Sequence, residues 1–103
     1  MKQLPVLYEE AAREDIREIF NYVLERSQDV VTATRYVSRI RARCAAIGDA
    51  PHGGVARDDL RPGIRMIPFE RSVVILYRVT DEAVEISNIF GRGRDYERFM
   101  RGQ

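Results

Sequence analysis

The spacing of apolar residues changes about halfway along this 103-residue chain. In the first half they recur every three or four residues, which is typical of α-helices that bury one face. From Ile64 onward they fall in short runs that are rich in β-branched and aromatic residues and are separated by turn sequences, which indicates strands. A chain in which helices precede consecutive strands is expected to fold as α+β.

Two helices are predicted in the first half, after a short strand from Leu4 to Tyr8. The first runs from about Glu10 to about Arg26, and acidic residues crowd its first turns, where the helix dipole favours them. The second follows Asp29, a candidate N-cap, and stops before Gly48 and Pro51. The apolar stripes are Ala12, Ile16, Ile19, Phe20 and Val23 in the first helix, and Ala33, Val37, Ile40, Cys44 and Ile47 in the second. Because the connection is short, the helices should pack as an antiparallel hairpin.

Three strands are predicted in the second half: Ile64 to Phe69, Ser72 to Val79, and Val84 to Ile89. Short turns join them, so they should form an antiparallel meander. The segment before them, Gly48 to Gly63, is rich in Gly, Pro and Asp and is predicted to be loop.

After the last strand, the sequence GRGRD predicts a turn in which the glycines take positive φ and Asp95 caps a short terminal helix, YERFM. The predicted order is therefore β-α-α-β-β-β, with an antiparallel sheet packed against an N-terminal helical hairpin and a possible short C-terminal helix. Residues 1–103 form one domain in this interpretation.

The composition excludes several classes of protein. Hydrophobic residues make up 45% and charged residues 32%, which is ordinary for a soluble globular domain. No apolar run is long enough to span a bilayer and the N-terminus has no signal-peptide pattern, so we expect a cytoplasmic protein without a membrane partner. The single cysteine, Cys44, suits a reducing compartment, and with only one histidine, His52, no metal site is expected.

Candidate reactive side chains have simpler interpretations. Cys44 lies on an apolar stripe and is expected to be buried, whereas His52 lies in a turn sequence and should be exposed. Tyr77 belongs to a strongly apolar strand and Tyr96 should pack the terminal helix. The GRGRD loop lacks the Lys-Ser/Thr ending of a phosphate-binding P-loop. We therefore expect no catalytic residue and no cofactor.

Arginine dominates the basic residues, because Lys2 is the only lysine among 17. Arginine is suited to bidentate contacts with carboxylates and phosphates. The meander should bring Arg61, Arg65 and Arg78 to one edge, with Arg92 and Arg94 toward the opposite end. These arginines are either solvated ends that contribute little or anchors for acidic side chains of a partner.

Five segments carry a family resemblance: EEAAREDIREIFNYVLERS, AAIGDAPHGG, LRPGIRMIPF, VVILYRV and VEISNIFGRGRDYERFM. Their order and spacing resemble the RelE/ParE superfamily of toxins from bacterial type II toxin–antitoxin modules, and the ParE branch in particular. The resemblance covers nearly the whole chain. One departure is Phe90, where many relatives carry His.

The resemblance implies a toxin that is held inactive in a hetero-oligomer by a cognate ParD-like antitoxin, with a ribbon-helix-helix start and a disordered tail. ParE-type toxins act on DNA gyrase, and no direct DNA binding is expected. The antitoxin-binding candidates are Ile19, Val23, Tyr36, Ile40, Arg61, Arg65, Phe69 and Arg78, although most of the apolar ones can equally be core. The resemblance assigns target contact to the C-terminal segment: Asn88, Phe90, Arg92, Arg94, Tyr96, Arg98 and Met100.

Two alternatives stay open. RelE-like relatives share the fold and cut mRNA on the ribosome, which requires groups that donate and accept protons. With one lysine, Lys2, and one loop histidine, the sequence argues against this reaction, because arginine is a poor acid or base. The other alternative is a protein with the toxin fold that serves only as a binding partner.

Overall fold

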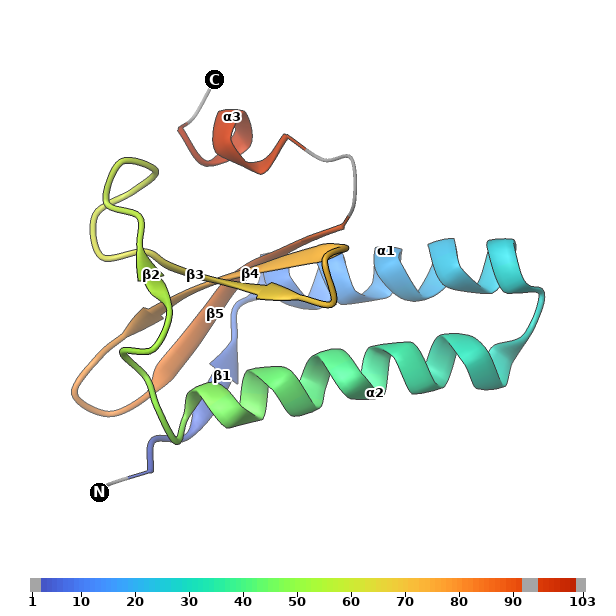
Figure 1. Ribbon diagram of the computed structural model, residues 1–103, viewed down its shortest axis with the longest axis horizontal. Helices are drawn as coiled ribbons and strands as arrows, with labels where there is room; N and C mark the ends of the chain where they lie inside the picture. Colours follow the sequence, from blue (N-terminus) through green and yellow to red (C-terminus); the bar gives the residue numbers. More distant parts are fainter. Residues whose placement is uncertain (1–2, 92–94, 102–103) are drawn as a thin grey trace.

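The computed structural model describes residues 3–91 and 95–101 and confirms an α+β fold (Figure 1). Two long helices precede the main strands, and a short helix ends the described chain. In chain order the elements are β1 (Val6–Tyr8), α1 (Glu10–Ser27), α2 (Val30–Ile47), β2 (Val55–Ala56), β3 (Arg65–Phe69), β4 (Val73–Val79), β5 (Val84–Gly91) and α3 (Tyr96–Met100).

The helices α1 and α2 form the antiparallel hairpin that their short connection predicts (Figure 1). Asp29 is the N-cap of α2, as predicted: its carboxylate accepts a hydrogen bond from the Val31 amide at 3.0 Å. Asp95 likewise accepts from the Arg98 amide at 3.2 Å and caps α3, which confirms the second predicted cap. Gly91 of the predicted GRGRD turn does not take the positive φ predicted for it, because it ends β5 as extended backbone paired with Val73. Residues 92–94 of that turn lie outside the described residues.

Gly48 ends α2, but for a reason other than the left-handed conformation common after helices. Its φ is −61°, which any residue can adopt. A Cβ atom at this position would lie 2.3 Å from the carbonyl oxygen of Leu4. The glycine therefore lets the segment before β1 approach the end of α2, where the Leu4 amide donates to the Gly48 carbonyl at 3.0 Å.

The sheet has five strands in the order β1-β5-β4-β3-β2. The β3-β4-β5 meander is antiparallel, as predicted, but β1 pairs with β5 in parallel, so the sheet as a whole is mixed. The segment predicted to be entirely loop also contains β2, whose residues pair with Met66 and Arg65. A two-residue strand is too short to leave a periodic signal in the sequence.

A bulge in β5 changes which side chains face the helices. Leu76 pairs with Asn88 but the next residue, Tyr77, pairs with Ile86, which leaves Ser87 without a partner across the ladder. Ile86 and Ile89 consequently both face the helical hairpin, and Phe90 faces the opposite side. Strict alternation would have put Phe90 on the same face as Ile86.

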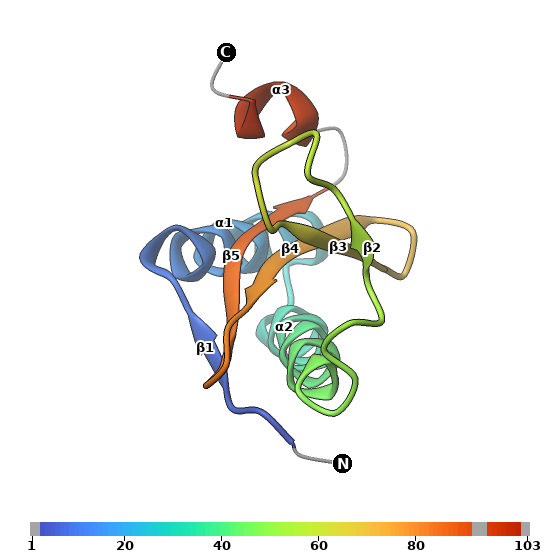
Figure 2. The ribbon, with the colours of Figure 1, turned by 90° about the vertical axis from the view of Figure 1, so that its left-hand side faces the viewer.

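Figure 2 shows the helix α2 and the short helix α3 on opposite sides of the sheet. Side chains pack on both faces of the sheet. The larger cluster joins the hairpin to one face, with Ile40, Cys44 and Tyr77 fully buried. A smaller cluster lies on the other face beneath α3: Leu60, Ile64, Leu76, Phe90 and Met100. The burial of Cys44 and Tyr77 and the exposure of His52 confirm the predictions for those residues.

Candidate functional site: a groove between the helical hairpin and the sheet

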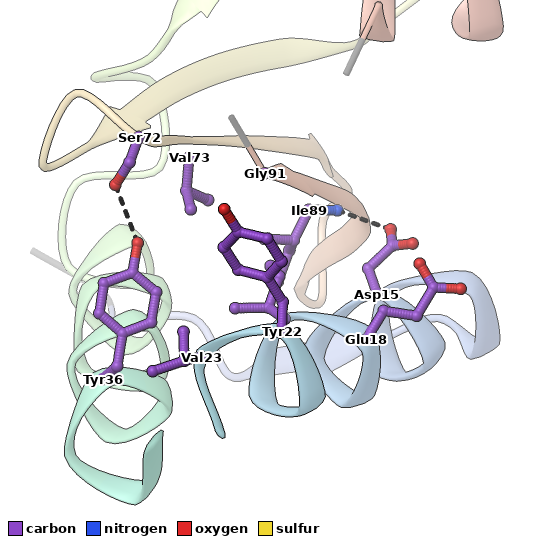
Figure 3. A pocket seen from close by; sticks show the side chains of 10 residues that line it. Asp15, Glu18, Tyr22, Val23, Tyr36, Ser72, Val73, Ile89 and Gly91 are labelled. Atoms are coloured by element: carbon purple, nitrogen blue, oxygen red, sulfur yellow. Dashed lines mark hydrogen bonds between the residues drawn. The ribbon is translucent and has the colours of Figure 1, made fainter. Parts of the chain in front are cut away.

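A groove of about 410 Å³ opens where the hairpin meets the ends of β4 and β5. Figure 3 shows its walls: α1 below, Tyr36 of α2 on one side, and the strands above. We call it the tyrosine groove and define it by Asp15, Glu18, Ile19, Tyr22, Val23, Tyr36, Ser72, Val73, Ile89 and Gly91. None of the described residues of α3 lines it.

The floor of the tyrosine groove is apolar. Val73 and Ile89 are buried strand residues, while Ile19 and Val23 of α1 are half-buried. Tyr22 stands at the edge with 57% of its surface exposed, which is unusual for an aromatic residue beside an apolar floor. The groove thus offers apolar surface that this chain leaves uncovered.

One end of the groove is fixed by hydrogen bonds between α2 and the turn before β4. The hydroxyls of Tyr36 and Ser72 lie 2.8 Å apart, and the Tyr36 ring meets Phe69 edge to face at 5.8 Å. Arg39 makes a bidentate ion pair with Glu70 at 2.8 and 3.0 Å. These contacts hold the wall formed by Tyr36 in place.

The other end is fixed by a bond between α1 and β5. Asp15 accepts a hydrogen bond from the Ile89 amide at 2.8 Å, and Glu18 lies one turn further along the helix (Figure 3). Arginines lie over both tyrosine rings: Arg26 is 5.2 Å from the centre of Tyr22, and Arg39 is 5.2 Å from that of Tyr36. The groove therefore combines an apolar floor with polar and charged edges.

The structure brings together three of the residues predicted to contact an antitoxin. Ile19, Val23 and Tyr36 all line the tyrosine groove. Ile40 is fully buried and Phe69 is 6% exposed, so both support the groove from within the core and do not line it.

The three arginines predicted at one edge of the meander bind three different parts of the chain. Arg61 donates to the carbonyl of Met100 at 2.7 Å. Arg65 donates to the carbonyls of Gly54 and His52 at 3.2 and 3.0 Å. Arg78 lies 3.7 Å from Glu9. Each has a partner within the chain, so they do not form one cluster of uncommitted charges.

The predicted target-contact residues divide by exposure. Asn88, Phe90 and Met100 are buried, at 5%, 3% and 1% exposure. Tyr96 is half-buried and stacks on Phe90 at 6.2 Å, as expected of a residue that packs the terminal helix, while Arg98 is exposed. Arg92 and Arg94 lie outside the described residues.

Sequence reasoning missed several lining residues, of which Tyr22 is the most prominent. Tyr22 follows Ile19 by three residues, so helical spacing already places it at the edge of the apolar stripe. Ser72, Val73, Ile89 and Gly91 carry no comparable signal. Their position in the groove depends on how β4 and β5 end beside α1.

No group of three or more His, Cys, Asp or Glu side chains that could hold a metal ion occurs among residues 3–91 and 95–101. Burial raises the pKa of the Cys44 thiol, which keeps it a poor nucleophile. No helix in the described part of the chain is long and apolar enough to cross a membrane.

Comparisons with known proteins place the chain in a family. A family model described as the ParE toxin of type II toxin–antitoxin system, parDE, matches residues 6–96. A solved structure of the chromosomal ParDE TA system from P. aeruginosa is similar in fold, with a TM-score of 0.75 and 19% sequence identity. The match covers 87% of this chain and 97% of that one. No curated protein matches the chain.

Proposed function

Because the chain belongs to the ParE toxin family of type II toxin–antitoxin systems, we propose that it inhibits DNA gyrase and is neutralised by a cognate ParD-like antitoxin. Inhibition proceeds by binding, in the cytoplasm, without catalysis by this chain and without direct DNA contact. The observation that supports the proposal best is the tyrosine groove, an uncovered apolar surface beside the helical hairpin.

The shape of the groove fits an amphipathic helix from the antitoxin. Its floor is supplied by Ile19 and Val23 of one helix and by Val73 of the sheet, so an apolar helix face can pack against it. The antitoxin would have a ribbon-helix-helix start and a disordered tail. The tail would become ordered on this surface, and the two proteins would form a hetero-oligomer.

The C-terminal segment is proposed to contact gyrase. Of the candidates in the described residues, Tyr96 and Arg98 are accessible in α3. Asn88, Phe90 and Met100 support that surface from below, because they are buried beneath it. The charged side chain of Arg98 and the ring of Tyr96 are the kinds of group that dominate protein interfaces.

Antitoxin binding can be tested with one substitution in the groove and one outside it. Tyr22→Asp places a charge against the apolar floor and should weaken binding of the cognate antitoxin at least tenfold in calorimetry. The matched control is Leu7→Asp, which alters a residue of β1 that is 54% exposed and lies outside the groove. Equal affinity of both variants for the antitoxin would contradict the proposed site.

Gyrase inhibition requires a separate experiment. Purified toxin should block supercoiling by purified gyrase and cause cleaved DNA complexes to accumulate, and added antitoxin should restore supercoiling. Normal supercoiling with no cleaved complexes would refute the gyrase assignment. Primer extension on cellular mRNA after induction then distinguishes the RelE-like alternative, which predicts cuts at positions set by the codons.

A further inference from the structure

A second hollow, of about 380 Å³, lies over the seam where α1, α2 and β1 meet. Its rim carries the side chains of Arg13, Arg17 and Arg41. Its remaining lining is Tyr8, Ile16, Phe20 and Val37. We call it the arginine pocket. It shares no lining residue with the tyrosine groove, although α1 contributes to both.

The floor of the arginine pocket is apolar and only partly covered. Ile16 is 5% exposed, whereas Phe20 and Val37 are half-buried. These side chains belong to the apolar stripes of the hairpin, yet the two helices do not cover them completely. An apolar group from a partner would gain by burying the remaining surface.

Arg41 carries the uncompensated charge at the rim. The helix α2 contains four arginines and neither Asp nor Glu. The Arg41 guanidinium lies 5.4 Å from the centre of the Tyr8 ring, and none of the ion pairs among the described residues involves it. A guanidinium has five N–H donors, so its contact with Tyr8 leaves others that can reach a carboxylate.

Tyr8 adds a neutral hydroxyl beside Arg41. A tyrosine hydroxyl is protonated at neutral pH, and burial raises the pKa of Tyr8 further, to about 12. A phenol in that state can donate a hydrogen bond.

The other two arginines have only exposed partners on their own helix. Arg13 lies 4.0 Å from Glu10, and their side chains are 63% and 79% exposed. Arg17 lies 2.5 Å from Glu14, and theirs are 61% and 51% exposed. Such surface pairs contribute little, so a carboxylate from a partner can replace either glutamate at small cost.

We propose that the arginine pocket binds an acidic peptide segment of a protein partner, with a bulky apolar side chain on Phe20 and Val37 and a carboxylate on Arg41. The arginines of the rim favour acidic groups, and the apolar floor favours a bulky apolar side chain. An acidic peptide segment carries both kinds of group. A nucleic-acid backbone carries phosphates but no apolar side chain, so it would leave the floor formed by Phe20 and Val37 uncovered. This inference is independent of the proposed function, because it concerns a different surface and does not depend on the partner's identity.

The test is a titration of the full-length, ¹⁵N-labelled protein with two synthetic peptides, followed by NMR. The acidic probe is acetyl-Ala-Glu-Leu-Phe-Glu-Ala-amide, and the control probe has lysines in place of the glutamates. We expect saturable shifts of the amides of Phe20, Val37 and Arg41 with the acidic probe and none with the lysine probe. Shifts centred on the tyrosine groove, or no saturable shifts, would overturn the proposal.

Two variants with the same charge change separate this site from general attraction to a basic helix. Arg41→Glu should weaken binding of the acidic probe at least tenfold. Arg35→Glu changes an exposed arginine of α2 outside the pocket and should alter the affinity less than twofold. Equal losses would mean that only the overall charge of α2 matters. Sedimentation with phosphatidylglycerol vesicles that depends on Arg41, without peptide binding, would assign the pocket to a lipid surface and overturn the proposal as well.

Discussion

Tyr77 has a fully buried side chain whose hydroxyl fastens the loop after α2 to the sheet. It donates to the Pro51 carbonyl at 2.8 Å and accepts from the Gly54 amide at 3.0 Å. Arg65 holds the same loop through the carbonyls of His52 and Gly54. A Cβ atom on Gly54 would lie 2.5 Å from the Tyr77 hydroxyl, so the close approach requires glycine. The side chains of Tyr77 and Arg65 thus hold the loop after α2 in place on the sheet.

We predict that Tyr77→Phe lowers the free energy of unfolding by about 1–3 kcal/mol, because the buried Gly54 amide loses its acceptor. Urea denaturation measures the change. Tyr22→Phe is the matched control, since Tyr22 is 57% exposed and its hydroxyl can bond to water. The control should change stability by less than about 0.5 kcal/mol. Similar losses in both variants would contradict the role assigned to the Tyr77 hydroxyl.

Tyr8 provides a prediction for alkaline pH. Its pKa is raised to about 12, chiefly by burial, whereas an unfolded tyrosine ionises near pH 10. Between these values the unfolded chain loses the proton first, so the stability contributed by neutral Tyr8 declines as the pH rises. Absorbance at 295 nm should show a titration step near pH 12, and Tyr8→Phe should lack this step. A wild-type titration complete by pH 11 would contradict the prediction.

The turn between β3 and β4 lies at one end of the tyrosine groove and has an unusual backbone. The Ser72 amide donates to the Phe69 carbonyl at 3.1 Å, and the central residues Glu70 and Arg71 have φ of 49° and 63°. Glycine and asparagine are preferred at such positions, because side chains with a Cβ are strained there. The ion pair of Glu70 with Arg39 helps to hold the turn against α2.

Arg71→Gly is therefore predicted to raise the free energy of unfolding by about 1 kcal/mol, because glycine adopts positive φ without strain. The comparison is Glu82→Gly, in a turn residue that does not have positive φ, where the added backbone freedom should lower stability. Thermal denaturation of the two variants measures both effects. If Arg71→Gly lowered the free energy of unfolding, the arginine side chain would stabilise the fold by more than its positive φ destabilises it.

At the scale of the whole molecule, an ionic network joins α3 to the segment before β3. Arg57 contacts both Asp59 and Glu97 at 2.9 Å, and Arg101 contacts Asp59 at 3.1 Å. Beneath this network Met100 is buried among the apolar residues of the smaller cluster. The terminal helix thus covers the sheet face opposite the hairpin, and the tyrosine groove stays open.

This network predicts how stability depends on acid. Hydrogen bonds from Arg57, and then from Arg101, lower the pKa of Asp59 below its ordinary value near 4. A depressed pKa stabilises the folded state above pH 4, and the contribution is lost as the pH falls below it. Asp59→Asn should therefore lower the urea midpoint at pH 7, and its difference from the wild type should shrink between pH 4 and pH 2.

Asp81→Asn is the control for this experiment, since Asp81 is an exposed turn residue outside the network. It should change the urea midpoint little at either pH. A difference between Asp59→Asn and the wild type that does not depend on pH would show that the carboxylate charge is not what holds α3.

By itself, the sequence determined the class of fold and the two long helices, in which apolar residues recur every three or four positions. The apolar stripes predicted α1 and α2 closely, and the caps Asp29 and Asp95 lie where the sequence places them. These features depend on neighbouring residues, whose spacing the sequence records directly. The same stripes identified Ile19 and Val23, and Tyr36 flanks one of them; all three line the groove.

Only the tertiary structure decided what depends on contacts between distant segments. The bulge at Ser87 turned Phe90 away from the hairpin, and the pairing of β1 with β5 made the sheet mixed. Arg61, Arg65 and Arg78 found separate partners within the chain because loop and helix carbonyls or carboxylates lie within their reach. Packing decides how distant strands pair and which partner a long side chain contacts. These contacts produce no periodic pattern in the local sequence, so the sequence alone does not predict them.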